Sequence, residues 1–132
     1  MGMRMRAFAL VAALVALVLI GGCATTQYEP VERSMSCSSR DACDASWQRA
    51  QAWLATHAGY RLAVVSVVVL QTYGPQQYST YPGFTVTRLS NPDGSGTIRV
   101  RAACDAQYGQ GGRYCLFDAV PHAAALLTAM ER

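Results

Sequence analysis

The spacing of apolar residues after residue 37 predicts a helix near each end of this part of the chain. Between residues 38 and 58, residues suited to a core recur at helical spacing, and Gly59 follows as a left-handed cap. They are Cys43, Trp47, Ala50, Leu54 and His57. A second helix is expected after Asp118, with Pro121 in its first turn. Its core stripe is Ala123, Leu126, Leu127 and Met130.

The stretches between these helices predict β-strands. Residues 62–72 are almost entirely aliphatic and are apolar at both even and odd positions. Residues 84–90 and 97–104 instead alternate between apolar and polar positions on either side of the turn cluster 91–96, which predicts a hairpin with one buried face and one wet face. A short fourth strand is predicted over residues 113–117. The polar positions of the hairpin include Thr85, Thr87, Arg99 and Arg101.

This order of elements predicts a two-layer α+β domain, α-β-β-β-α, with an antiparallel sheet of three to four strands and both helices on one face. The strand over residues 62–72 is expected at a sheet edge, because the other two strands are joined by a short turn and should be neighbours. A long aliphatic edge strand without Pro or Lys is an aggregation hazard unless it is covered. We therefore expect the N-terminal tether, a second copy or another protein to cover it.

The N-terminal 22 residues have the pattern of a secretory signal peptide. A short head containing Arg4 and Arg6 precedes a fourteen-residue uncharged apolar run over residues 7–20. This run is shorter than the roughly 20 apolar residues that a membrane-spanning helix needs.

The end of that run, Leu19-Ile20-Gly21-Gly22-Cys23, resembles the lipobox of bacterial lipoproteins. The resemblance implies cleavage before Cys23, acylation of the Cys23 thiol and a mature chain of 110 residues attached to a membrane. Ala24, in place of the Asp associated with inner-membrane retention, implies the periplasmic side of the outer membrane of a Gram-negative bacterium. Several acyl chains on one cysteine bind a membrane far more firmly than a single chain does.

Residues 24–36 after the lipidated Cys23 have little apolar periodicity and contain Pro30, which predicts a flexible tether. The folded domain is expected over residues 37–132. Within it, the stretch from Cys43 to Trp47 and the strand ending Gln71-Thr72-Tyr73 resemble small lipoproteins of Gram-negative bacteria. That resemblance implies no particular activity.

With Cys23 assigned to lipid, an even number of cysteines remains in an exported domain, which predicts two disulfides. They are Cys37, Cys43, Cys104 and Cys115. The local pairs Cys37–Cys43 and Cys104–Cys115 are favoured because both close short loops, while a long-range pair such as Cys43–Cys115 stays open. Zinc is the alternative use, but C-x5-C and C-x10-C are not usual ligand spacings.

Charge and motifs argue against nucleic-acid binding and catalysis. The formal charge is +3, and removal of the two arginines in the signal peptide leaves nine Arg against eight acidic residues, or +1. This is unlike the basic footprint of a nucleic-acid binder. His57 or His122 with Asp118 and a serine would be the best catalytic assembly, but no nucleophile elbow, metal-ligand spacing or paired-carboxylate signature accompanies them. We expect neither an enzyme nor a metal or cofactor.

The sequence therefore favours an envelope protein that acts by protein–protein interaction, with self-association as one form, or has a structural role. The candidate surface is Val65, Val67, Thr85, Thr87, Arg99, Arg101, Tyr73, Tyr78 and Tyr81. The alternative is a small-ligand or cell-wall-binding module that uses the tyrosine-rich segment 73–83, with Arg99 and Arg101, to hold sugars or anions. Those tyrosines have a simpler explanation too, which is that they pack the segment onto the sheet.

Overall fold

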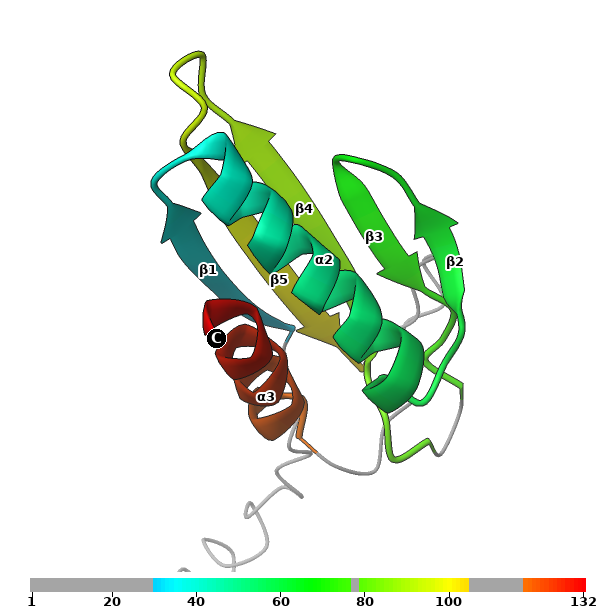
Figure 1. The fold of residues 1–132 in the computed structure, drawn as a ribbon. Coiled ribbons are helices and arrows are strands. Elements are labelled where there is room, and N and C mark those ends of the chain that lie inside the picture. Colours follow the sequence, from blue (N-terminus) through cyan, green and yellow to red (C-terminus); the bar gives the residue numbers. More distant parts are fainter. Residues whose placement is uncertain (1–29, 77–78, 105–117) are drawn as a thin grey trace, which may run out of the picture.

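A computed structural model describes residues 30–76, 79–104 and 118–132, which form five β-strands and two α-helices (Figure 1). In chain order these elements are β1 (Val31–Cys37), α2 (Arg40–His57), β2 (Leu62–Val65), β3 (Val69–Thr72), β4 (Gly83–Ser90), β5 (Gly96–Ala103) and α3 (Val120–Glu131). The α+β class matches the prediction, and the sheet has more strands than the expected three to four.

The strands form one antiparallel sheet in the order β1-β5-β4-β3-β2, so β1 and β2 are its two edges. Figure 1 shows α2 and α3 side by side on one face of this sheet, with β2 at the far edge. Most helix-facing positions of β3, β4 and β5 are apolar and buried, as the alternation of β4 and β5 predicts. They include Leu70, Phe84, Val86, Ile98, Val100 and Ala102.

Local side-chain contacts fix both helices. The Ser39 hydroxyl accepts a hydrogen bond from the Ala42 N–H at 3.2 Å and so caps the start of α2. Gly59 has φ +76° just after the helix, as expected for a left-handed cap. At the end of α3, the Met130 carbonyl accepts hydrogen bonds from Ser46 and Arg49 of α2. A cation at a helix C-terminus also complements the helix dipole.

Residues 31–36, which the sequence places in the tether, instead belong to strand β1. This strand pairs with β5 from Val31↔Ala102 to Cys37↔Gly96. Val31 and Cys37 are buried against the helix layer. The apolar alternation is weak because Arg33 occupies one of the inward-facing positions, so the strand owes its place to the backbone of β5 more than to its own pattern.

Residues 62–72, which the sequence predicts as one continuous strand, form a hairpin instead. The chain runs along β2, turns at residues 66–68 and returns as β3. The predicted edge position is correct for its first half, because β2 is the edge strand and β3 separates it from β4. An apolar sequence on both faces does not reveal this turn, which depends on the side chain of Ser66.

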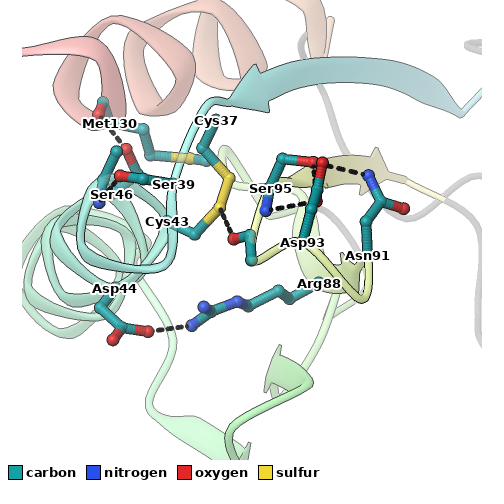
Figure 2. The surroundings of a disulfide bond; sticks show 12 residues. Cys37, Ser39, Cys43, Asp44, Ser46, Arg88, Asn91, Asp93, Ser95 and Met130 are labelled. Atoms are coloured by element: carbon teal, nitrogen blue, oxygen red, sulfur yellow. Dashed lines mark hydrogen bonds and ion pairs between the residues drawn. A yellow bond between two sulfur atoms is a disulfide. The ribbon is translucent and has the colours of Figure 1, made fainter.

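The local disulfide Cys37–Cys43 is confirmed. It joins the end of β1 to the first turns of α2 and lies next to the β4–β5 turn, where the Cys43 sulfur is 3.9 Å from the Gly94 carbonyl oxygen (Figure 2). Cys104 is disulfide-bonded as well. Cys115, its predicted partner, lies outside the described residues, as do Cys23, Tyr78 and the strand predicted over residues 113–117.

Candidate functional site

The turn between β2 and β3 is organised by one polar side chain in an otherwise aliphatic segment. The Ser66 hydroxyl accepts hydrogen bonds from the N–H groups of Val68 and Val69, at 3.2 and 2.8 Å, and donates one to the Val69 carbonyl at 3.0 Å. Serine side chains commonly stabilise turns in this way. Ser66 therefore gives the chain a local alternative to a longer strand.

This turn is tied to the rest of the domain by two further hydrogen bonds. The indole N–H of buried Trp47 on α2 donates to the Ser66 carbonyl at 3.2 Å. On the other side, the Arg88 N–H donates to the Val68 carbonyl at 2.8 Å, which continues the β3–β4 ladder by one residue. The turn is consequently held in place by both layers of the fold.

Four valines on this hairpin remain exposed. Their side chains are 42% exposed at Val64, 54% at Val65, 78% at Val67 and 50% at Val68. We call this set the valine hairpin. Complete burial of a valine contributes roughly 1.5–3 kcal/mol relative to exposure. Val64 and Val65 are neighbours on β2 and therefore point to opposite faces of the sheet, while Val67 and Val68 lie in the turn, so the exposed valines surround the end of the hairpin.

The face of the sheet opposite the helices, which we call the open face, carries the polar residues that the sequence assigns to it. Thr87 pairs with Arg99, and Thr85 pairs with Arg101, on β4 and β5. Strand β1 extends these two rows, because Ser34 pairs with Arg99 and Glu32 pairs with Arg101. The four predicted residues Thr85, Thr87, Arg99 and Arg101 are thus brought together.

A shallow depression of about 360 Å³ lies at the β1 side of the open face. Its lining residues are Glu32, Arg33, Ser34 and Arg99. Glu32, Ser34 and Arg99 lie on the open face, so the depression offers at least one carboxylate and one guanidinium group. Of these residues, only Arg99 belongs to the surface predicted from the sequence, because the others lie in the segment predicted to be a tether.

The predicted surface is therefore divided among separate places. Val65 and Val67 belong to the valine hairpin and are apart from the threonine and arginine rows. Tyr73 lies beside Arg61, whose guanidinium carbon is 5.9 Å from the ring centre. Tyr81 packs over Gly59, where an added Cβ would approach the ring to 2.4 Å. Each of these two tyrosines thus has a contact with a neighbouring residue, which agrees with the simpler explanation that they pack the segment onto the domain.

The two histidines contact aromatic rings. His57 stacks on Trp53 with ring centres 5.3 Å apart, and its Nδ1 is 2.7 Å from the Thr56 hydroxyl. His122 lies against Tyr81, with ring centres 5.8 Å apart. The Asp118 carboxylate accepts a hydrogen bond from the Val120 N–H at the start of α3. The candidate catalytic assembly of a histidine with Asp118 is not joined by any of these contacts.

One carboxyl group has a shifted pKa. The Ser95 hydroxyl and the Ser95 N–H both donate to Asp93 in the β4–β5 turn (Figure 2), and these hydrogen bonds hold the pKa of Asp93 below its ordinary value of 3.8. The residue is fully exposed. Its hydrogen bonds serve the turn, in which the Asn91 side chain also donates to the Ser95 hydroxyl.

The described part of the chain shows no cluster of three or more His, Cys, Asp or Glu residues that could hold a metal ion. Among residues 30–76, 79–104 and 118–132, neither helix is both long and apolar enough to cross a membrane. Comparison with protein-family models, curated proteins and solved structures finds no match.

Proposed function

We propose that this chain is a lipid-anchored protein of the cell envelope that acts by protein–protein interaction and catalyses no reaction. The lipobox ending at Cys23 supports attachment to the periplasmic side of the outer membrane. The observation that carries the interaction is the valine hairpin, in which two valines of edge strand β2 and two valines of the turn after it stay exposed.

The hairpin suits a binding role because it is exposed and also held in shape. The hydrogen bonds of Trp47 and Arg88 to the turn hold its backbone before any partner arrives. Binding then costs less conformational entropy than the ordering of a loose loop would. Burial of the valines supplies the driving force, since each exposed valine forgoes part of the roughly 1.5–3 kcal/mol that burial provides.

The anchor is tested by Cys23→Ser in a Gram-negative host. We expect the wild-type chain in the outer-membrane fraction and labelled by a palmitate analogue, and the variant unlabelled and unattached. Persistence of the label in the variant would rule out Cys23 as the lipidation site.

The interaction is tested by a photo-crosslinking amino acid placed at Val65 in growing cells, with Gln51 as the matched control on the exposed side of α2. We expect a discrete crosslinked species from position 65 and none from position 51. Equal yields from both positions would refute the valine hairpin as the contact surface. Positions Thr87 and Arg99 report on the open face in the same experiment.

A second candidate function is small-ligand or cell-wall binding in the depression beside Arg99. The guanidinium of Arg99 and the carboxylate of Glu32 suit a ligand with both acidic and basic groups, such as a cell-wall peptide. Arg99→Ala should weaken the binding of cell-wall fragments, whereas Arg61→Ala, which removes an arginine outside the depression, should not. Equal affinities in the two variants would dismiss this site.

A further inference from the structure

All five strands reach one end of the sheet in a common row of residues. Strand β1 begins there at Val31, which pairs with Ala102 of β5, and Ala102 in turn pairs with Phe84 of β4. The row continues to Thr72 of β3, whose hydroxyl accepts a hydrogen bond from the Phe84 N–H at 2.9 Å. It ends at Leu62 of β2, which pairs with Thr72.

Both helices also meet this end of the sheet. Tyr81 packs over Gly59, which follows α2, and its ring centre is 5.8 Å from that of His122 in the first turn of α3. In Figure 1, α2 ends and α3 begins at the lower end of the view. We call this surface the entry end, because the described chain enters the sheet here. It consists of the described residues 30, 59–61, 73–76, 79–83 and 118–122.

The entry end carries a second group of exposed apolar and aromatic side chains. Among the described residues, all the large exposed hydrophobic side chains outside the valine hairpin, except Leu89, lie there. They are Tyr73, Tyr81 and Val120, which are 56%, 41% and 40% exposed. Tyrosine combines an apolar ring with a polar tip and is enriched where a membrane meets water. The entry end therefore has the composition of a membrane-interface surface.

The length of chain before the described residues limits how far the entry end lies from a lipid on Cys23. Seven residue steps separate Cys23 from Pro30. An extended chain advances about 3.3–3.6 Å per residue, so the entry end lies within about 25 Å of the lipid attachment. The turn of the valine hairpin is about 13 Å further along the strands. The anchor thus holds the entry end closer to the bilayer than the turn.

We infer that the entry end docks on the phospholipid surface, with the side chains of Tyr73, Tyr81 and Val120 at the boundary between headgroups and acyl chains. This inference rests on the lipidation of Cys23 in the proposed function and assigns a separate role to a separate surface. The anchor keeps the entry end at a high effective concentration beside the bilayer, so a small contact area is enough for docking.

The charges of the entry end make apolar and aromatic contact the source of the attraction. Arg61 and Asp118 are both exposed and opposite in sign. The Arg61 guanidinium carbon is 5.9 Å from the ring centre of Tyr73, which places a cation beside the ring, where it can contact a lipid phosphate. Because the two charges cancel, docking does not require an anionic lipid.

Docking also determines where the valine hairpin lies relative to the bilayer. Strand β2 runs from Leu62 at the entry end toward the turn at Ser66, and so away from the docked surface. In the docked domain the turn therefore faces away from the lipid. A protein partner reaches it without competing with the membrane.

The test compares the depth of the two ends of the domain in a membrane. The full lipidated chain carries one added cysteine with a nitrobenzoxadiazole fluorophore, on phosphatidylcholine vesicles that contain phosphatidylcholine spin-labelled near the headgroup. Thr80→Cys places the fluorophore at the entry end, and Ser90→Cys places it at the opposite end of β4, where the native residue is also an exposed hydroxyl side chain. We expect several-fold stronger quenching at position 80. Equal quenching at the two positions would overturn the inference.

Substitution of Tyr73 separates docking from mere nearness to the anchor. Tyr73→Ser should reduce the quenching at position 80 several-fold, whereas Tyr73→Trp, which keeps an interfacial ring, should retain it. The matched control Val67→Ser removes a more exposed side chain, 78% against 56%, from the valine hairpin and should change nothing. Val120→Ser, on α3, should weaken the quenching independently of Tyr73. Quenching that survives in folded Tyr73→Ser and Val120→Ser variants, as judged by circular dichroism, would contradict docking.

Two readouts separate this inference from the proposed function. A chain that carries the palmitate label but shows no quenching at position 80 would overturn docking and leave the anchor in place. Loss of both the label and membrane attachment would overturn the anchor on which docking rests. Photo-crosslinking at Val65 reports on the protein interaction in either case.

Discussion

The ion pair between Arg88 and Asp44 offers a quantitative test of how the two layers of the domain are joined. Arg88 lies on β4 on the helix side of the sheet, and its Nη1 is 2.6 Å from Asp44 Oδ1 on α2 (Figure 2). The arginine side chain is 11% exposed and that of Asp44 is 49% exposed. Arg88 Nε is buried and has no hydrogen-bond partner among the described residues. A buried cation therefore depends on one half-exposed carboxylate.

Asp44→Ala leaves this guanidinium buried without a counter-charge. Loss of one partner from a fully buried ion pair lowers the free energy of unfolding by about 3–5 kcal/mol. Asp44 is half-exposed, so water screens the remaining charge of Arg88, and we expect a loss of about 1–2 kcal/mol. For a domain of about 100 residues this corresponds to a fall in melting temperature of roughly 4–16 °C. Urea unfolding of the variant should show a lower midpoint with an unchanged slope.

The double variant separates the lost pair from lost packing. Arg88→Met removes the charge and keeps an unbranched apolar chain, so Asp44→Ala in an Arg88→Met background should cost less than about 0.5 kcal/mol. Asp44→Asn is the matched control for shape and should fall between wild type and Asp44→Ala. An Asp44→Ala variant as stable as wild type, or one equally destabilising in both backgrounds, would refute the argument from an uncompensated charge.

Two further predictions concern the region around the disulfide. Replacement of both Cys37 and Cys43 by alanine should lower the free energy of unfolding by about 2 kcal/mol, because the disulfide closes a short loop with a sequence separation of 6. Urea unfolding that shows no loss of stability in this variant would contradict the prediction. The lowered pKa of Asp93 adds stability that is fully present above its unfolded value of 3.8 and is lost as the pH falls from there through the folded pKa. Asp93→Asn should therefore make the free energy of unfolding fall less steeply with decreasing pH on the acid side. An unchanged dependence on pH would contradict the role given to these hydrogen bonds.

The parts of the fold that follow from the sequence are those in which one face of an element is plainly apolar. The alternation of Phe84 and Val86 with Thr85 and Thr87 predicts both the strand and its orientation, because a shift by one residue would bury the threonines. Likewise, the helical spacing of Trp47, Ala50 and Leu54 predicts the covered side of α2. In these elements local pattern and tertiary packing agree.

The parts that do not follow are decided by contacts between distant segments. Strand β1 has Arg33 at an inward-facing position, so its own pattern is ambiguous and its place depends on pairing with β5. In residues 62–72 both faces are apolar, so the period of two carries no information about where the strand ends. Val67 and Val68 are exposed because the chain turns at Ser66. This turn is not recognisable from the sequence pattern, because valines surround Ser66 on both sides.

The position of the valine hairpin relative to the tether bears on which partners can reach it. The described chain enters the sheet at the start of β1, where Val31 pairs with Ala102. The hairpin turn lies beside Arg88 of β4, which pairs with Ile98 of β5. Ile98 in turn pairs with Met35, which is four residues after Val31 in β1. At about 3.3 Å per residue and about 4.8 Å per strand, the turn is displaced by about 13 Å along the strands and by about 14–19 Å across the sheet. A partner that binds the hairpin therefore contacts the corner of the sheet diagonally opposite the point where the described chain enters it.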